Sequence, residues 1–253
     1  MSRARAVSLS QAAGCRQGAR LFLLLLALAA ATIVLSAGAV PRSALPGALA
    51  MMKLHSNPLS PYGRKVKIAM AMKGVNDKIE MVATDTNPAD VPVLNKANPL
   101  AKIPALVLDD GTAIYDSPVI CEYLDSLAPA PPLFPNSGPQ RFKTLTMGAL
   151  GDGILDAALL LVYEKRFRPE EKWHAPWQQR QQGKIDRAVA HLEQRPPAWS
   201  GGPDYGHLTV ACALGYLDFR HEGKWRANSP KMMAWLDQFA KAVPAFEATR
   251  PKV

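Results

Sequence analysis

Residues 128–139, APAPPLFPNSGP, divide the chain into two parts with different hydrophobic patterns. The segment holds five prolines and shows no periodicity, so we interpret it as a linker. Before it, runs with strand spacing alternate with runs of helical spacing, whereas after it the apolar residues recur only at helical spacing. This change predicts an α/β domain over residues 52–127 and an all-helical domain over residues 140–253.

The α/β part is expected to form a mixed sheet with helices packed on it. Helical spacing extends over residues 61–73 and again over 118–126, where Ser117 is the expected N-cap. Four runs have the composition of strands: MKLHS (52–56), KIEMVAT (78–84), PALVL (104–108) and TAIY (112–115). The last two are joined through Asp110-Gly111, a strong hairpin signal. We therefore expect the element order βαβ and then ββα.

The helical part is expected to surround one buried helix. Residues 209–219 are almost continuously apolar, which is typical of a helix enclosed by others. Ser229-Pro230 has the residues of a helix start, and we interpret Ser229 as the plain N-cap of the last clear helix.

The first 51 residues are treated as a leader and left out of the fold argument. Residues 21–40, LFLLLLALAAATIVLSAGAV, are almost wholly apolar and follow two arginines. They fit a membrane anchor or a secretory signal. Because Met51-Met52 stands at the start of the first predicted strand, translation could also begin there. We favour a mis-called start or a dispensable leader, with anchoring or export through residues 1–40 as the alternative.

The net charge of +9 gives little support for a nucleic-acid partner. Residues 1–51 contain five Arg and no acid, so the remainder carries only +4 and shows no block of like charge. We therefore expect no nucleic acid among the partners, and a membrane only if residues 21–40 are retained.

Cysteine and histidine usage indicates a reducing compartment and no metal. Cys15, Cys121 and Cys212 are far apart, and the last two lie in patterns of buried helix. A disulfide framework is not indicated, which predicts a cytoplasmic location. The five histidines never approach one another or a cysteine at metal-ligand spacing, so we expect no metal site.

The segment NPLSPYGRK (57–65) joins the first strand to the first helix and raises two interpretations. Ser60 followed by Pro61 is typical of a plain N-cap. A hydroxyl at the positive end of a helix is also placed to hold an anion. The same dipeptide recurs at Ser117 and Ser229, so the dipeptide alone does not decide.

Two further groups in the α/β part suit a charged ligand. Asp116 and Ser117 stand at a second helix start, where an anion site lies beside a carboxylate that could hold an ammonium group. Lys102 precedes Ile103-Pro104 at the entrance to a strand. A small zwitterionic peptide that carries a thiol could bind all three groups: its thiol to Ser60, one amino-acid end to Asp116 and Ser117, and a second carboxylate to Lys102.

Four features in this order resemble the soluble glutathione S-transferases over residues 52–250: SPYGRK (60–65), NPLAKIPAL (98–106), DSPVICEYLD (116–125) and a proline-rich linker into helices. The similarity is closest to bacterial members with Ser-Pro-aromatic at the active turn. The resemblance implies a thioredoxin-like domain followed by an all-helical domain, usually in a homodimer.

The resemblance also implies roles for the site residues. Ser60 would donate a hydrogen bond to the glutathione sulfur and favour its thiolate, which is the nucleophile. The backbone of Ile103, beside a cis Pro104, would pair with the cysteinyl residue. Asp116 and Ser117 would bind the γ-glutamyl end, and Lys102 would contact the glycyl carboxylate. Glutathione is then a co-substrate, and no cofactor is expected.

Several neighbouring residues are interpreted more plainly. Arg64 and Lys65 could add to the positive field of the site, but we expect them to be solvated helix cations. Ser56 is a rival of Ser60 for the thiol contact, but we expect it to be a strand-end residue. Asp152 and Tyr163 would face the second-substrate pocket, the dimer contact or the core edge. Where the family has a Ser/Thr-x-x-Asp capping box, this chain has Asp204 and His207. We expect the box to be weakened by about 1 kcal/mol.

The expected activity is conjugation of the glutathione thiolate to small hydrophobic electrophiles that bind in an apolar pocket of the helical domain. The active turn contains no Cys, which disfavours reduction of disulfides, and Cys121 is expected to face the core. The alternative is a non-catalytic scaffold with the same fold, as in stress-response relatives that contact other proteins.

Overall fold

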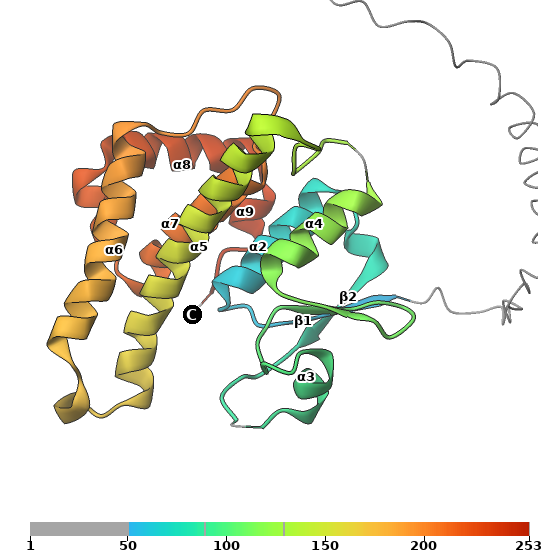
Figure 1. Cartoon of the computed structure of the whole chain (residues 1–253), viewed down its shortest axis with the longest axis horizontal. Helices are drawn as coiled ribbons and strands as arrows, with labels where there is room; N and C mark the ends of the chain where they lie inside the picture. The colour runs from blue at the N-terminus through green and yellow to red at the C-terminus, as the bar shows by residue number, and fades with distance from the viewer. Residues whose placement is uncertain (1–50, 89, 129, 253) are drawn as a thin grey trace, which may run out of the picture. The chain divides into compact units, whose positions relative to one another are not determined.

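The structure is a computed structural model that describes residues 51–88, 90–128 and 130–252 (Figure 1). The predictions for the leader, including the apolar run 21–40 and Cys15, lie outside the described residues. Residues 49–253 form a compact unit by themselves.

The α/β part contains the predicted mixed sheet. In chain order its elements are β1 (Met52–Ser56), α2 (Pro61–Met72), η1 (Asn76–Lys78), β2 (Ile79–Ala83), α3 (Pro92–Ala97), β3 (Ala105–Val107), β4 (Ala113–Ile114) and α4 (Ser117–Leu127). The strand order is β2-β1-β3-β4, with β1 parallel to β2 and antiparallel to β3, and β3 antiparallel to β4. The predicted hairpin and the predicted element order are thus confirmed.

Helices cover both faces of this sheet. Figure 1 shows α2 and α4 on one face and α3 on the other. Because successive side chains of a strand point to opposite faces, β3 contributes to both cores. Leu106 joins the large core beneath α2 and α4, whereas Ala105 packs with Leu94 and Ala97 of α3.

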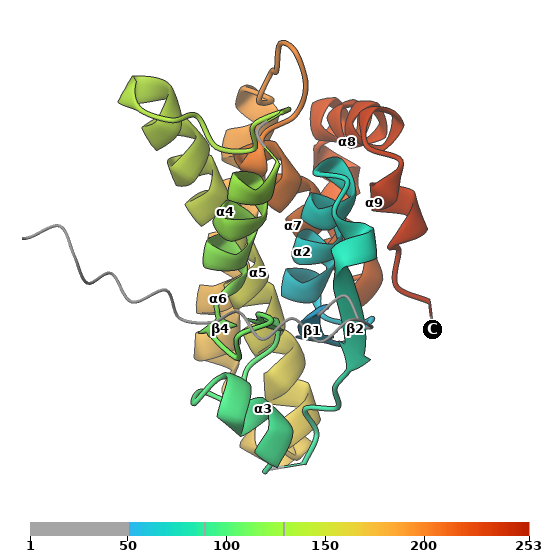
Figure 2. The ribbon, with the colours of Figure 1, turned by 90° about the vertical axis from the view of Figure 1, so that its right-hand side faces the viewer.

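The helical part follows α4 after a segment without helix or strand. Its elements are α5 (Gly138–Phe167), η2 (Glu170–Lys172), α6 (Ala175–Gln194), α7 (Tyr205–Arg220), η3 (Lys224–Asn228), α8 (Pro230–Ala242) and α9 (Ala245–Ala248). Residues 205–217 of α7 are all buried, which confirms the predicted central helix. α7 contacts both α5 and α2, and so lies between the two parts (Figures 1 and 2).

The proline-rich segment does more than connect. The carboxylate of Asp125, near the end of α4, accepts the backbone N–H groups of Leu133 at 2.8 Å and Phe134 at 3.0 Å. Lys73 of α2 donates to the same carboxylate at 2.8 Å. Leu133 and Phe134 are buried, and the Phe134 ring stacks on Tyr205 of α7 with centroids 4.5 Å apart. The segment is therefore anchored in the core.

Close approach of α5 and α7 depends on glycine. A Cβ on Gly151 would lie 2.9 Å from the backbone carbon of Thr209 and 3.0 Å from the backbone nitrogen of Val210. Backbone atoms cannot move aside as a side chain can, so the two helices could not pack this closely with a larger residue. The glycines of GALGDG (148–153) lie in α5, as the sequence indicated.

The α7 capping box is complete, so the missing second hydrogen bond on which the expected weakening rested is present. His207 donates its backbone N–H to Asp204 Oδ1 at 3.1 Å, and the Asp204 N–H donates to His207 Nδ1 at 3.2 Å. The imidazole nitrogen thus takes the place of the missing carboxylate oxygen. Thr144 of α5 also donates to Asp204 Oδ2 at 2.5 Å.

The N-terminus of α8 is capped differently from the prediction. Ser229 makes no side-chain capping bond. Instead the carboxylate of Glu193, from α6, accepts the N–H groups of Lys231 at 3.0 Å and Met232 at 2.8 Å. A distant side chain therefore supplies the acceptor that the sequence assigned to Ser229.

Among the described residues, α5 is the helix whose length and composition would suffice to cross a membrane. The core helix of a soluble protein passes the same test. Here α5 packs against α6 and α7.

Candidate active site

Three segments that are far apart in the sequence meet at one end of the sheet. β1 ends where the turn that carries Ser60 begins. Because β3 is antiparallel to β1, Ile103 and Pro104, which precede β3, lie at the same end as this turn. β4 is antiparallel to β3, so Asp116 and Ser117, which follow β4, return to that end. The topology therefore brings the predicted site residues into one region.

Ser60 is half-buried and is the N-cap of α2, as the sequence predicted. Its Oγ accepts the backbone N–H of Gly63 at 3.1 Å. Asn57 closes the preceding turn, because its carbonyl accepts the Ser60 N–H at 3.0 Å and its Oδ1 accepts the Leu59 N–H at 2.9 Å. A hydroxyl that accepts one hydrogen bond keeps its own hydrogen for another acceptor. Ser60 can thus cap α2 and donate outward at the same time.

Gly63 allows the end of β1 to pack against the first turn of α2. A Cβ on Gly63 would lie 2.2 Å from Ser56 Oγ. Ser56 is 3% exposed, and its Oγ has no hydrogen-bond partner among the described residues. Ser56 is therefore buried against the first turn of α2, whereas Ser60 remains half-buried.

The loop before β3 is held by Asn98. Its Nδ2 donates to the carbonyl of Lys102 at 2.9 Å, and its Oδ1 accepts the N–H of Leu100 at 3.0 Å. The side chain of Lys102 is exposed and makes no ion pair within the described part of the chain. The Ile103–Pro104 peptide bond is cis, as the resemblance implied, and so is Tyr115–Asp116.

The start of α4 lies one residue earlier than predicted. Asp116 occupies the N-cap position without making a side-chain capping bond, and Ser117 is the first helical residue. Asp116 is exposed, whereas Ser117 is buried. Because the first N–H groups of a helix have no partner within it and carry partial positive charge, this end can attract an anion.

The interpretation of Arg64 and Lys65 as solvated cations is wrong. The two residues are 3% and 0% exposed. Lys65 Nζ lies 2.5 Å from Asp152 Oδ1 of α5 and donates to the Tyr205 hydroxyl of α7 at 3.2 Å. Burial raises the pKa of Asp152, although the charge of Lys65 opposes this effect. The contact with Lys65 places Asp152 at the junction of α2 and α5, which the sequence analysis did not consider.

The helical period contained a signal for these buried cations. Pro61, Lys65, Ile68 and Met72 recur at helical spacing, so Lys65 lies on the face that carries the buried Ile68. If the helical spacing is applied to the cations as well as to the apolar residues, it predicts that Lys65 lies on the buried face of α2.

An apolar stripe on α5 lies next to the turn that carries Ser60. Tyr62 of α2 donates a hydrogen bond to Asp156 of α5, and burial followed by this bond raises the pKa of the Tyr62 hydroxyl. Leu160, Tyr163 and Phe167 follow at helical spacing and are exposed, with the last two rings edge to face at 5.1 Å. Tyr163 therefore belongs to an open apolar surface that begins beside α2.

The two described cysteines are not placed for chemistry. Cys121 and Cys212 are fully buried, and burial raises the pKa of their thiols to about 12 and about 11. Cys121 faces the core, as the sequence predicted. Within the residues that the structure describes, no group of three or more His, Cys, Asp or Glu could hold a metal ion.

Two cavities lie in or against the helical part and are not lined by Ser60. One of about 590 Å³ lies among α5, α6, α7 and η3. The other, of about 230 Å³, lies among α7, α8 and the C-terminal segment and is also lined by Arg64 of α2.

Family models match both parts of the chain. Residues 59–127 match the glutathione S-transferase N-terminal domain, and residues 175–238 match the glutathione S-transferase C-terminal domain.

Individual proteins are similar over most of the chain. The uncharacterised GST-like protein YibF of Escherichia coli is 32% identical over 204 residues, which are 79% of this chain and 98% of YibF. A glutathione transferase family member from Pseudomonas fluorescens, whose crystal structure contains bound glutathione, is 42% identical with a TM-score of 0.75. That match covers 80% of this chain and 100% of the other.

A shorter similarity is confined to one part. The stringent starvation protein A homolog of Coxiella burnetii is 41% identical over 85 residues, which are 34% of this chain and 39% of the relative.

Proposed function

This chain belongs to the glutathione S-transferase family, and from that premise we propose that it adds the glutathione thiolate to small hydrophobic electrophiles. The match to the Pseudomonas fluorescens relative covers the full length of that relative, whose structure contains bound glutathione. This supports glutathione as the first substrate. No metal or other cofactor takes part in the proposed reaction.

The free hydrogen of Ser60 is the observation that carries this proposal. Among the described residues its Oγ accepts one hydrogen bond, from the Gly63 N–H, and donates none, and it lies at the positive end of α2. A hydroxyl that donates to sulfur stabilises the thiolate over the thiol, and the helix dipole acts in the same direction. Each unit by which the thiol pKa falls corresponds to about 1.4 kcal/mol.

The remaining glutathione contacts are proposed for the residues gathered at the same end of the sheet. The backbone of Ile103, beside the cis Pro104, pairs with the cysteinyl residue. Asp116 and Ser117, at the start of α4, bind the γ-glutamyl end. The exposed Lys102 meets the glycyl carboxylate.

The electrophile is proposed to bind over the exposed stripe of α5. Leu160, Tyr163 and Phe167 present apolar surface beside Tyr62, two residues after Ser60. Such surfaces attract apolar molecules without selecting one structure.

We further propose a cytoplasmic homodimer. Val119 of α4 and Phe142 of α5 are 50% and 68% exposed, and the Glu122–Arg141 ion pair joins these two helices. Exposed apolar side chains that lie near one another are typical of interfaces. Analytical ultracentrifugation measures the oligomeric state directly.

The decisive experiment measures conjugation of glutathione to a chlorodinitrobenzene-type substrate. We expect Ser60→Ala to lower kcat/KM by about ten- to a hundredfold, which corresponds to the loss of one hydrogen bond to a charged group. Ser229→Ala is the matched control, because Ser229 also precedes a proline at a helix start and lies in another part of the fold. Equal turnover by wild type and Ser60→Ala would exclude Ser60 as the activating residue.

The alternative is a non-catalytic scaffold that contacts other proteins. The similarity to a stringent starvation protein A homolog over 85 residues favours it. A folded protein that is not retained on immobilised glutathione would support the scaffold over the transferase.

A further inference from the structure

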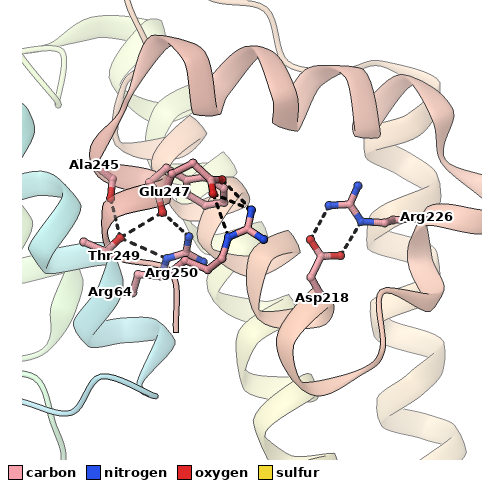
Figure 3. A network of polar contacts seen from close by, with 8 residues as sticks. Arg64, Asp218, Arg226, Ala245, Glu247, Thr249 and Arg250 are labelled. Atoms are coloured by element: carbon pink, nitrogen blue, oxygen red, sulfur yellow. Dashed lines mark hydrogen bonds and ion pairs between the residues drawn. The ribbon is translucent and has the colours of Figure 1, made fainter. Parts of the chain in front are cut away.

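Arg64 joins the active turn to a segment from the other end of the chain. Its backbone N–H donates to the carbonyl of Ser60 at 2.9 Å, within the first turn of α2. Its side chain extends toward the C-terminal segment, where Nη2 donates to the carbonyl of Phe246 at 2.6 Å and Nε donates to Thr249 Oγ1 at 3.4 Å (Figure 3). The guanidinium carbon lies 4.1 Å from the centroid of the Phe246 ring.

The space for this side chain is provided by α7. A Cβ on Gly215 would lie 2.5 Å from Nη1 of Arg64 and 3.2 Å from the Phe246 ring. Arg64 and Phe246 are both 3% exposed. The guanidinium is thus packed tightly against Gly215 of α7 and the Phe246 ring of α9, and elsewhere it borders the cavity of about 230 Å³.

Neighbouring carboxylates are held by other arginines. Asp218 accepts two bonds from Arg226, at 2.8 and 2.6 Å, and Glu247 accepts two from Arg250, both at 2.9 Å (Figure 3). Arg64 has no ion pair with a carboxylate of the described residues, so its partners are a carbonyl, a hydroxyl and a ring. Burial accordingly lowers the pKa of Arg64.

A buried guanidinium with this partner set is directional. The two hydrogen bonds and the ring fix the plane of the group and the distance between α2 and α9 at once. Lysine could make one of these contacts, and methionine could only fill the volume. The contact therefore constrains the first turn of α2 more strongly than apolar packing would.

We propose that Arg64 is a positioning residue for Ser60, and that through it the C-terminal segment Ala245–Thr249 sets the direction of the Ser60 hydroxyl. This inference rests on the proposed function, because the hydroxyl must act on a bound thiol. Arg64 itself touches neither substrate.

The test uses the full-length chain with glutathione bound. The pKa of the bound thiol is measured from the pH dependence of the thiolate absorbance in the ultraviolet, and glutathione affinity is measured by titration calorimetry. We expect Arg64→Met to raise the thiol pKa by about one unit, which is about tenfold less thiolate at low pH, with affinity changed by less than about threefold. Arg64→Lys should recover part of this shift.

The control is Arg226→Met, which removes an arginine from the same region that contacts Asp218 and not α2. Its thiol pKa should equal that of wild type. Because Arg64→Met could destabilise the fold, Thr249→Val provides a milder change that removes a partner of Arg64 and leaves α2 intact. We expect it to raise the thiol pKa in the same direction by a smaller amount.

The outcomes separate this inference from the proposed function. If Arg64→Met and Thr249→Val are less stable but bind glutathione with the wild-type thiol pKa, Arg64 is only structural and the inference is overturned. If wild type does not bind glutathione, or binds it with an ordinary thiol pKa, the proposed function fails first and the inference fails with it.

Discussion

Gly63 shows how strongly a single residue constrains the turn that carries Ser60. The first turn of α2 must approach the end of β1 so that Ser60 lies at the edge of the sheet. Only a hydrogen at the Cα of residue 63 leaves space for the Ser56 hydroxyl, which is buried there and has no hydrogen-bond partner in the part of the chain that the structure describes. The buried hydroxyl and the glycine therefore form a matched pair.

We expect Gly63→Ala to destabilise the protein by about 1–3 kcal/mol, because its Cβ would overlap Ser56 Oγ. The free energy of unfolding is measured with urea. Gly153→Ala is the control, because residue 153 lies on the exposed side of α5 and an added Cβ would meet no other atom. Its free energy of unfolding should rise by up to about 1 kcal/mol. Ser56→Ala should rescue Gly63→Ala, and a double variant no more stable than Gly63→Ala would contradict the steric explanation.

At the scale of elements, helix starts in this protein are secured by more than the residue at the N-cap. α2 uses its own Ser60, α7 uses Asp204 together with an imidazole, and α8 uses a carboxylate from α6. In each case the acceptor satisfies backbone N–H groups that have no partner within the helix. The acceptor for α8 comes from another element, so it also fixes the packing of α6 against α8.

For α8 we expect Glu193→Ala to lower the free energy of unfolding by about 1 kcal/mol, since two N–H groups lose their acceptor. Ser229→Ala should cost clearly less, because its hydroxyl makes no capping bond. Urea denaturation of the two variants measures both values. A larger loss for Ser229→Ala would show that the serine is the effective cap.

For α7 the carboxylate of Asp204 predicts a pH dependence. Burial alone would raise the pKa of Asp204, but hydrogen bonds from His207 and Thr144 outweigh it and hold the pKa below the ordinary value. A carboxyl with a lowered pKa in the folded state contributes stability above its unfolded pKa of about 3.9. This contribution is lost as the pH falls through the folded pKa.

We therefore expect the stability difference between wild type and Asp204→Asn to be constant from pH 7 to about pH 5 and to shrink below about pH 4. Urea unfolding across this range measures the difference. Asp237→Asn removes an exposed carboxylate that makes no hydrogen bond or ion pair in the described chain. The stability difference between this variant and wild type should change little with pH. A difference for Asp204→Asn that grows on acidification would reverse the assigned direction.

At the scale of the whole described unit, α2 is the element that joins the two parts. The four positions after Pro61, residues 62–65, either contact the helical part or, at Gly63, allow close packing within the α/β part. Tyr62 contacts α5, Arg64 contacts the C-terminal segment, and Lys65 contacts α5 and α7. The helix that presents Ser60 is thus held by the helical part as well as by α4 and the core of its own domain.

We expect Lys65→Met to destabilise the protein by about 2–4 kcal/mol, because it leaves the largely buried Asp152 carboxylate without its cation. The double variant Lys65→Met/Asp152→Leu should recover more than half of this loss, since an apolar pair removes the unpaired charge. Urea unfolding of both variants provides the comparison. Additive losses would mean that the two side chains do not act as a pair.

Much of the architecture could be predicted from local patterns. Alternation and helical spacing located the strands and helices, Asp110-Gly111 located the hairpin, and Ser60-Pro61 located the start of α2. These features depend on neighbours within a turn or a strand pair, which a linear sequence displays directly. The four ordered motifs also led to the correct family.

Partners across the fold were beyond these patterns. Helical spacing does not reveal that Asp152 faces Lys65, that Glu193 caps α8, or that Arg64 reaches Phe246. The sequence by itself determined the type and order of most elements and placed their ends to within about two residues, because those choices depend on backbone preferences and short-range contacts. Only the tertiary structure decided which charges are buried, since the free energy of a buried charge depends on groups that the chain brings together from distant positions.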